Sequence, residues 1–441
     1  MSLLLAAALA QQAPEERPSL AQSPENAVVE LTATGRELLA MATRALSSGR
    51  EDIAIRILGA LVRDRDLRVR NEARFRLAML AARDEDWSGA GTWLRAILDE
   101  EPGAQRARLE LARVQAEMGD IDGARRTLRQ AQAGSLPPDV ARLVDRFSSA
   151  LRERKPFGFG IDLAIAPDSN VNRATRSTTL GTVIGDFDLD EEARKTSGTG
   201  VKAGAEAYYR HPLSADVSLL ARGGVSGNFY REGRLNDVLA VVSIGPEFDL
   251  LSGRANLLFG GQQRWFGGDR FYTSLDANMQ WQKPLGRRSQ LRTGLGVSRV
   301  NYRTNDLQDA FVITGFTGVE RALGTRAGAG MTLGGARQIA REPAYSQVSG
   351  QITATGWREF GRSTVFLSAT YLHLEADRRL ALYRHRRKED FLRFSLGATL
   401  RALQWQGWAP QIRVIYERNS SPIEVYRYDR WRGEFGVVRA F

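Results

Sequence analysis

The clearest structural signal in the chain is the stretch Phe271-Tyr-Thr-Ser-Leu-Asp-Ala-Asn-Met-Gln-Trp-Gln282. Its odd-numbered positions are mostly apolar, whereas its even-numbered positions are all polar. Successive side chains of a β-strand point to opposite faces, so this period of two predicts a strand with one apolar and one polar face. The pattern and the length suit a strand that crosses a membrane, with lipid on one side and a wet lumen on the other.

The same alternation recurs along the last two-thirds of the chain, for example in residues 291–298 and 391–401. Gly and aromatic residues become frequent there, and turn residues separate the alternating stretches. We count fourteen strand candidates, near residues 157–166, 197–211, 214–230, 236–250, 253–266, 270–283, 287–302, 308–322, 325–338, 345–359, 362–375, 389–402, 408–418 and 430–441.

The connections between these candidates alternate in length. Short turns such as 252–253 and 360–361 follow the even-numbered candidates, whereas longer links such as 167–196 and 376–388 follow most odd-numbered ones. Outer-membrane barrels have this pattern, with short turns at one end and long loops at the other. A soluble sandwich repeats its strands roughly every 8–12 residues, but a strand and its connection take about 20 here. The sequence therefore predicts an α + β multidomain protein whose residues 157–441 form an antiparallel transmembrane β-barrel of fourteen strands.

The first third of the chain has helical periodicity and repeats itself. The segment 73–78 matches the segment 107–112 at an offset of 34 residues, and the likeness continues to Leu94 and Leu128. This offset is the period of the tetratricopeptide repeat, which is a pair of antiparallel helices. We expect residues 27–153 to form such a helical domain, capped by a last helix near 138–153. The residues expected to let the helices pack closely, or to follow their ends, are Ala78, Ala90, Ala112, Ala124 and Pro102.

Stacked repeats form a short solenoid with a concave groove. By their position in the repeat, the residues that could line this groove and touch a cargo are Glu72, Phe75, Met79, Arg83, Arg106, Leu109, Arg113 and Glu117. Apolar stripes on helices usually face a core. Core packing is therefore the alternative role of Phe75, Met79 and Leu109.

Composition limits the chemistry that this chain of 441 residues could perform. It has no Cys, and its three His, at positions 211, 373 and 385, lie far apart. A disulfide framework, a thiolate metal site and a Cys nucleophile are therefore excluded. The chain also has no nucleotide-binding loop and no zinc-protease motif. We expect no catalysis, no metal and no cofactor.

The net charge of +11 is spread along the chain and comes without any nucleic-acid-binding motif, so we expect no nucleic-acid partner. Residues 1–13 resemble the remnant of a signal peptide, with an apolar run followed by small residues at Ala10 and Ala13. No later stretch has the roughly 20 apolar residues of a membrane-spanning helix, and a spanning segment made of strands must close into a barrel. We therefore expect a protein of the Gram-negative outer membrane, with its helical domain in the periplasm.

The junction between the two regions carries a more specific motif. Leu151-Arg-Glu-Arg-Lys155 leads into Phe157-Gly-Phe-Gly160, and the first strand candidate then runs into a barrel-entry turn made of Pro167, Asp168, Ser169, Asn170, Val171 and Asn172. Helical repeats, this junction and a fourteen-strand barrel together resemble the surface lipoprotein assembly modifier family over residues 27–441. The resemblance implies an outer-membrane factor that moves surface lipoproteins, or related secreted haem- or iron-binding proteins, from the periplasm to the cell surface.

Some of these segments have more than one interpretation. Asp, Ser and Asn favour tight turns, so the barrel-entry turn is either structural or a contact for cargo. The basic run 384–388 is either a binding site for lipopolysaccharide phosphates or a solvated loop. The acidic run 186–192 is expected to be a solvated loop rather than a calcium site. Phe441 is expected to be the C-terminal signal for the barrel-assembly machinery, and we expect a monomer.

Two other functions are compatible with the sequence. An outer-membrane pore or polysaccharide export channel with a periplasmic tetratricopeptide scaffold also joins helical repeats to a barrel. Such a pore would show a large and steady conductance. A third possibility is a scaffold protein, in which the repeats bind a periplasmic partner and the barrel is an anchor.

Overall fold

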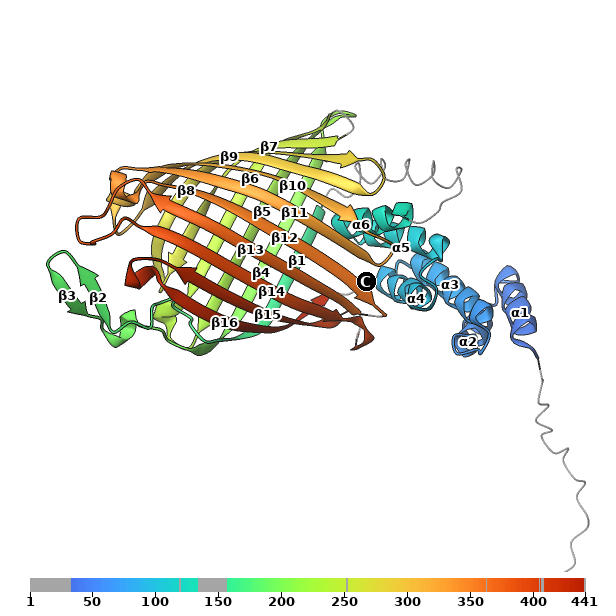
Figure 1. The fold of residues 1–441 in the computed structure, drawn as a ribbon. Coiled ribbons are helices and arrows are strands. Elements are labelled where there is room, and N and C mark those ends of the chain that lie inside the picture. The colour runs from blue at the N-terminus through green and yellow to red at the C-terminus, as the bar shows by residue number, and fades with distance from the viewer. Residues whose placement is uncertain are drawn as a thin grey trace, which may run out of the picture.

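In the computed structural model, an array of helices lies at one end of a closed β-barrel (Figure 1). The structure describes residues 33–118, 120–133, 157–250, 253–361, 363–403, 405 and 408–439. Across these ranges, no helix combines the length and the apolar character needed to cross a membrane. The predicted signal-peptide remnant at 1–13, the predicted helix near 138–153 and Phe441 lie outside the described residues.

The described helices follow one another as antiparallel pairs, as the repeat period predicts. They are α1 (Gly35–Ser47), α2 (Glu51–Leu61), α3 (Leu67–Arg83), α4 (Trp87–Glu100), α5 (Gln105–Glu117) and α6 (Ile121–Ala133). Aspartates at equivalent repeat positions cap the N-termini of α4 and α6. Asp86 accepts a hydrogen bond from the Gly89 N–H at 2.8 Å, and Asp120 accepts one from the Gly123 N–H at 2.8 Å. Each carboxylate satisfies an N–H group that has no partner within its own helix.

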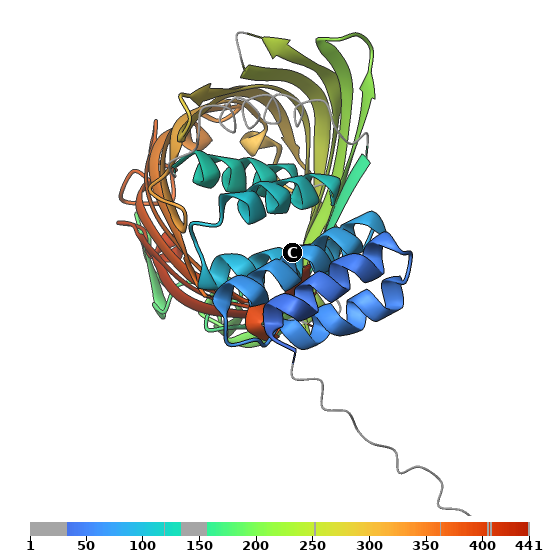
Figure 2. The same cartoon turned by 90° about the vertical axis from the view of Figure 1, so that its right-hand side faces the viewer.

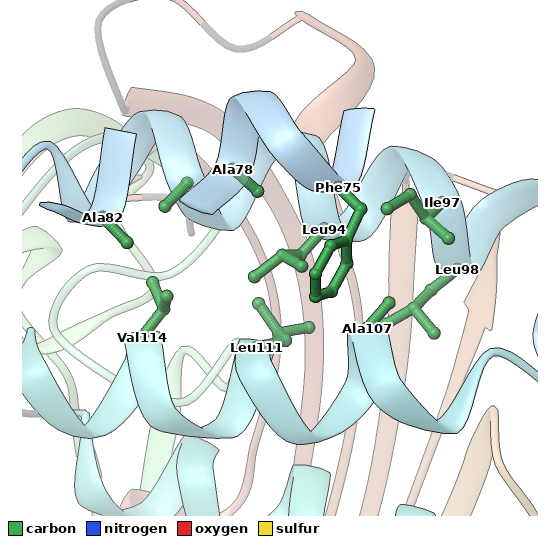
Figure 3. Close-up of a cluster of buried hydrophobic side chains, with 10 residues drawn as sticks. Phe75, Ala78, Ala82, Leu94, Ile97, Leu98, Ala107, Leu111 and Val114 are labelled. Atoms are coloured by element: carbon green, nitrogen blue, oxygen red, sulfur yellow. The ribbon is translucent and has the colours of Figure 1, made fainter. Parts of the chain in front are cut away.

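A buried apolar core joins α3, α4 and α5 (Figure 3). Ala78 of α3 lies over Leu94 of α4, Ala82 lies over Val114 of α5, and Leu111 of α5 completes the layer. Fully burying a side chain such as Leu94 contributes roughly 1.5–3 kcal/mol. One helix pair could not bury this surface alone, so the stacking of consecutive pairs stabilises the array.

The barrel strands pair antiparallel with their neighbours along the chain, and β1 closes the sheet on β16. They are β1 (Phe157–Asp168), β4 (Gly198–Pro212), β5 (Val217–Tyr230), β6 (Asp237–Leu250), β7 (Gly253–Phe266), β8 (Asp269–Leu285), β9 (Ser289–Tyr302), β10 (Ala310–Ala322), β11 (Ala327–Ala340), β12 (Gln347–Phe360), β13 (Ser363–Ala376), β14 (Lys388–Leu400), β15 (Trp408–Ser420) and β16 (Tyr428–Arg439). The prediction of a closed antiparallel barrel of fourteen strands is confirmed.

The two faces of the wall follow the period of two. On β8, Leu275 is 70% exposed and Met279 is 51% exposed, so both present apolar surface outward. Ser274, one residue away, is buried on the inner face and donates to Asp276 Oδ1 at 2.9 Å. The barrel therefore has an apolar skin for lipid and a polar, hydrogen-bonded lumen.

A small hairpin of β2 (Thr179–Thr182) and β3 (Gly185–Asp188) extends from the end of the barrel far from the helices (Figure 1). No strand was predicted in this link between β1 and β4. Its strands are four residues each, which is too short for an alternating pattern to be recognised.

Candidate functional site

Helix α6 docks on the barrel through two arginines. Arg129 donates one hydrogen bond to Gln290 Oε1 at 2.6 Å and another to Glu320 Oε1 at 2.7 Å. Gln290 of β9 and Glu320 of β10 are register partners, so a single guanidinium bridges two neighbouring strands. Arg125 donates to Gln282 Oε1 of β8 at 3.2 Å. Charge-assisted hydrogen bonds of this kind are among the stronger polar contacts in proteins.

Helix α4 docks beside α6. Arg326, in the short turn before β11, donates to the backbone oxygens of Leu98 at 3.1 Å and Asp99 at 2.7 Å. The last carbonyl groups of a helix lack partners within the helix and carry partial negative charge, so a cation stabilises them. Arg95 of α4 also lies 3.7 Å from Glu359 of β12. The helices are therefore held by the short-turn end of the barrel.

These docking contacts fall on one arc of the barrel. Their partners come from β8 to β12, and the closed strand order places β1 and β16 on the opposite side. In the view of Figure 2, the teal helices α5 and α6 lie across this end of the barrel. The array is thus anchored on one side of the mouth, with α6 reaching over it.

In two consecutive repeats, a buried arginine joins the two helices of the pair. Arg108 of α5 is 1% exposed, and it donates to Gln130 of α6 at 3.2 Å and to the Pro102 carbonyl at 3.0 Å. Burial lowers the pKa of its guanidinium to about 10, because the charged form loses its hydration. Arg74 donates to the Ala96 carbonyl at 3.3 Å, and these two positions precede 108 and 130 by one repeat.

The barrel-entry turn joins the first strand to the last. The Asp168 carboxylate accepts hydrogen bonds from Arg430 of β16, with Nε 2.9 Å from Oδ2 and 3.0 Å from Oδ1. The same guanidinium donates to Glu417 of β15 at 3.1 Å. All three side chains are buried, with 4% or less of each exposed. A buried charge is tolerated when it is paired and hydrogen-bonded, as these are.

The other residues of the turn complete this connection. The Ser169 N–H donates to the Trp431 carbonyl at 2.9 Å, and the Ser169 hydroxyl accepts from the Trp431 N–H at 2.8 Å. Asn170 donates to the Asp429 carbonyl at 3.0 Å. Toward β4, the Val171 N–H donates to the Thr196 carbonyl at 2.8 Å and Asn172 donates to the Arg194 carbonyl at 2.7 Å. Pro167 and Asp168 end β1 itself.

The residues proposed for a cargo groove have mixed surroundings. Phe75 is buried in the helical core and Met79 packs against that core. The Arg106 guanidinium lies 4.1 Å from the centre of the Phe75 ring, so these two predicted residues do meet. Since Phe75 is buried, however, the eight residues do not all share one exposed surface. Contact with cargo at these positions stays a prediction.

The charged members of that set have partners within the helices. Glu72 accepts from Arg76 at 3.0 Å, and Arg113 donates to Glu110 at 2.7 Å. Arg83 forms an ion pair with Glu51 of α2, and the remaining two residues, Leu109 and Glu117, are partly exposed.

The predicted packing residues lie where the helices meet. The four alanines are fully buried, whereas the proline lies in the turn between α4 and α5; they are Ala78, Ala90, Ala112, Ala124 and Pro102. Small side chains at these positions leave room for the close approach of neighbouring helices. Their role in packing was an expectation from the repeat, and the burial is consistent with it.

The acidic and basic runs meet at the far end of the barrel. Arg384 donates to the Thr182 carbonyl at 2.6 Å and to Asp186 Oδ1 at 3.1 Å, and the Val183 N–H donates to the Leu382 carbonyl at 3.0 Å. The two runs were predicted to be separate loops, whereas in the structure the basic run docks on the acidic one. Among the residues that the structure describes, no group of three or more acidic or His side chains is arranged to hold a metal ion.

A family model described as surface lipoprotein assembly modifier matches residues 158–438, nearly the whole barrel. The chain belongs to the surface lipoprotein assembly modifier family. A tetratricopeptide-repeat model matches residues 81–146, which include α4, α5 and α6. The family and the closed barrel together place this chain in the outer membrane.

Two members of the family illustrate the similarity. Surface lipoprotein assembly modifier 1 of Neisseria meningitidis serogroup B is 26% identical over 210 residues, which are 47% of this chain and 42% of that protein. The surface lipoprotein assembly modifier of Moraxella catarrhalis is 22% identical over 213 residues, which are 48% of this chain and 41% of that protein. The match thus spans less than half the length of each relative. Among solved structures, the outer-membrane expressed OmpT of Vibrio cholerae covers 64% of this chain and 97% of its own, with a TM-score of 0.39 and 12% identity.

Several contacts of this protein could not be predicted from its sequence. The docking residue Arg129 and its partner Gln290 are 161 residues apart, and Asp168 and Arg430 are 262 residues apart. A pattern within one strand or helix does not encode such pairings. A partial signal existed, because Gln290 and Glu320 are polar, inward-facing positions next to short turns.

Proposed function

We propose that this protein is an outer-membrane translocation and assembly factor that moves surface lipoproteins from the periplasm to the cell surface. The observation that carries the proposal is a helical-repeat array docked over one mouth of a barrel whose sequence belongs to the surface lipoprotein assembly modifier family. Helical repeats bind polypeptides along extended surfaces. A barrel mouth beside such a surface is suited to receive what the repeats bind.

In this proposal, residues 27–153 form the periplasmic domain and residues 157–441 form the barrel. The short-turn end faces the periplasm, so the helices meet cargo before it reaches the barrel. The cargo is a surface lipoprotein or a related secreted protein, with haem- or iron-binding proteins as the first candidates to test. No step requires catalysis, because the cargo changes its location and not its covalent structure.

The proposal also assigns contacts outside the mouth. The groove residues whose side chains are exposed or partly exposed are candidates for cargo contact. They are Glu72, Met79, Arg83, Arg106, Leu109, Arg113 and Glu117. The basic run 384–388 faces the cell surface, where lipopolysaccharide phosphates are partners of suitable charge. We further propose that the barrel-assembly machinery inserts the chain, with Phe441 as part of its signal, and that the protein acts as a monomer.

The test is surface display of a lipoprotein encoded beside this gene. Cells with the gene, cells lacking it and complemented cells are treated with an external protease, and the intact lipoprotein that remains is measured by immunoblot. We expect protease to remove most of the lipoprotein in the first and third strains and little of it in the second. Total lipoprotein before protease treatment is the control for expression.

Equal exposure in all three strains, with equal amounts of lipoprotein, would refute the proposal for that cargo class. The conductance of the purified barrel in planar bilayers tests the alternative function, a pore or export channel. A large, steady conductance together with unchanged display would favour the pore or polysaccharide export channel instead.

A further inference from the structure

The sheet is least complete where its first strand meets its last. On one side, β1 aligns with β4 along all twelve of its residues, from Phe157 to Asp168. On the other side, within the described residues, the register between β1 and β16 consists of Leu163 with Val437, Ala164 with Gly436, Ile165 with Phe435, and Asp168 with Arg432. We call this boundary the β1–β16 seam.

Toward the helices, the described part of the seam has no aligned residues beyond Leu163 and Val437. The same register would set Asp162 opposite Val438 and Ile161 opposite Arg439, but these described residues are not aligned. The register also skips Ala166 with Glu434 and Pro167 with Gly433 toward the far end, where side chains join the two strands instead. Val438 and Arg439 nevertheless continue their pairing with β15. Within lipid, every backbone polar group needs a partner, so a gap in the ladder marks the place where the wall opens with the least loss.

A cavity of about 350 Å³ lies where the aligned residues Leu163 and Val437 meet the unaligned Asp162 and Val438, and its lining is apolar on one side and charged on the other. Leu163 and Val437 belong to the outer skin of the barrel, where they are 53% and 44% exposed. On the inner side, Lys202 lies 3.6 Å from Glu434, and Arg413 lies 3.4 Å from the same carboxylate. The cavity therefore offers lipid-like and water-like surroundings within one wall.

The opposite half of the seam is held together by side chains. Asp168 and Ser169 bond to Arg430 and Trp431, as described above, and Pro167 contributes no N–H to the ladder. These contacts form a latch at the end far from the helices. An opening of the seam would therefore start at the helix-bearing end and stop at the latch.

The helical array does not bridge the seam in any contact described for the docking residues. It is anchored on β8 to β12, across the barrel from β1 and β16. The array can thus stay docked while the two strands at the seam separate.

We propose that the helix-bearing half of the β1–β16 seam is a lateral binding site for the acyl chains of a lipidated cargo, an inference that rests on the proposed transport of lipoproteins. A lipidated N-terminus has apolar chains attached to a polar, hydrogen-bonding peptide. In the seam, the chains lie against the apolar skin of β1, where Phe159 is 65% exposed and Ile161 is 60% exposed. The polar peptide faces the charged groups around Glu434.

The test locks the seam with a disulfide. The chain has no Cys, so Leu163→Cys with Val437→Cys introduces one possible pair, and register partners across antiparallel strands lie within disulfide range. The matched control is Val297→Cys with Ile313→Cys, which are outward-facing register partners on β9 and β10. Both variants are oxidised in cells, and surface display of the lipoprotein is measured by protease shaving with and without dithiothreitol.

We expect the oxidised seam variant to lose display at least tenfold, with recovery after reduction, while the oxidised control keeps it. Full display by a seam variant that is shown to be oxidised would overturn the inference. Loss of display in both oxidised variants would also overturn it, since any lock would then be enough. Failure of the unmodified protein to display the cargo would instead refute the proposed function, so the two outcomes are distinguishable.

A second measurement does not depend on disulfide formation. A photo-crosslinking amino acid replaces Phe159, on the part of β1 nearest the helices, or Val319, which is 42% exposed near the same end of β10. We expect a crosslink to the lipoprotein at position 159 and little at position 319. Equal crosslinking at both positions would count against a site at the seam.

Discussion

The docking of α6 predicts the effect of reversing one charge, at Arg129. This guanidinium bonds to Gln290 and Glu320, and 12% of its side chain is exposed, against 31% of that of Glu320. Arg129→Glu removes both hydrogen bonds and sets two carboxylates against each other. The matched control is Arg126→Glu, which makes the same change of charge on an exposed position of the same helix.

The size of the effect follows from these contacts. A hydrogen bond to a charged group contributes about 1.5–3 kcal/mol, and like charges placed together add to the loss. Because both side chains are partly exposed, we expect docking to weaken by about 2 kcal/mol, which is roughly a 30-fold rise in the undocked population. The contacts of Arg125 and Arg326 remain, so most molecules stay docked.

The assay measures access to the surface beneath α6. Gln290 is 7% exposed, so a Gln290→Cys variant of this cysteine-free chain reacts with a maleimide mainly when the helix leaves the mouth. Gln290→Cys already removes one of the two acceptors of Arg129, so in this background Arg129→Glu acts through Glu320 alone. It should raise the labelling rate roughly tenfold, which corresponds to a loss of about 1.4 kcal/mol in docking. Adding Glu320→Arg should restore slow labelling. Equal rates for Arg129→Glu and Arg126→Glu would refute the role of Arg129 in holding the helix.

Two further predictions concern the latch and the helical array. Asp168→Ala leaves the buried Arg430 without its main partner, at a cost of about 3 kcal/mol. The control, Asp162→Ala, removes a half-exposed pair with Lys202 that is worth about 0–1 kcal/mol. The temperature at which a heated sample loses its folded band on a gel should fall by several degrees more for Asp168→Ala than for Asp162→Ala. Burial opposes ionisation of Glu100, but hydrogen bonds from Arg74 and Arg70 outweigh it and lower the pKa of this carboxyl below 4.5. Its stabilising effect is therefore present above that value and is lost as the pH falls through the lowered pKa. Helical melting measured by circular dichroism should thus depend less on pH below 4.5 in Glu100→Gln than in the unmodified chain.

Local sequence patterns were sufficient to predict the elements of the fold. The alternation in β8 is visible because lipid requires an apolar residue at nearly every outward position, and the short turns require residues such as Gly286, whose φ is +67°. The repeat offset is likewise visible because the same unit, a pair of antiparallel helices, recurs along the chain. In both cases the constraint acts within about 35 residues of chain, which is the range over which such patterns are recognisable.

The contacts that define the site act over longer distances. Arg108 and Arg74 occur at equivalent repeat positions, but nothing in the sequence shows that their guanidinium groups are buried between helices. The barrel-entry turn was recognised as a motif, yet its partners Arg430 and Trp431 lie at the other end of the barrel sequence. Closure of a barrel brings the first and last strands of the sheet together. The residue pairs at this boundary can therefore be identified from the three-dimensional register but not from the motif alone.

A lipid-modified protein makes two opposing demands on a barrel. Its polypeptide needs polar surroundings, while drawing an acyl chain of about fifteen methylenes out of the bilayer into a wet lumen would cost on the order of 12 kcal/mol. The lumen beside the latch is charged, with Arg393 3.1 Å from Glu417 and Arg173 3.2 Å from the same carboxylate. An opening in the wall removes the conflict, because the chains stay in lipid while the peptide enters the barrel. This explains why the helical array docks on β8 to β12. An array bound to both β1 and β16 would hold the seam closed, and the acyl chains could not enter it.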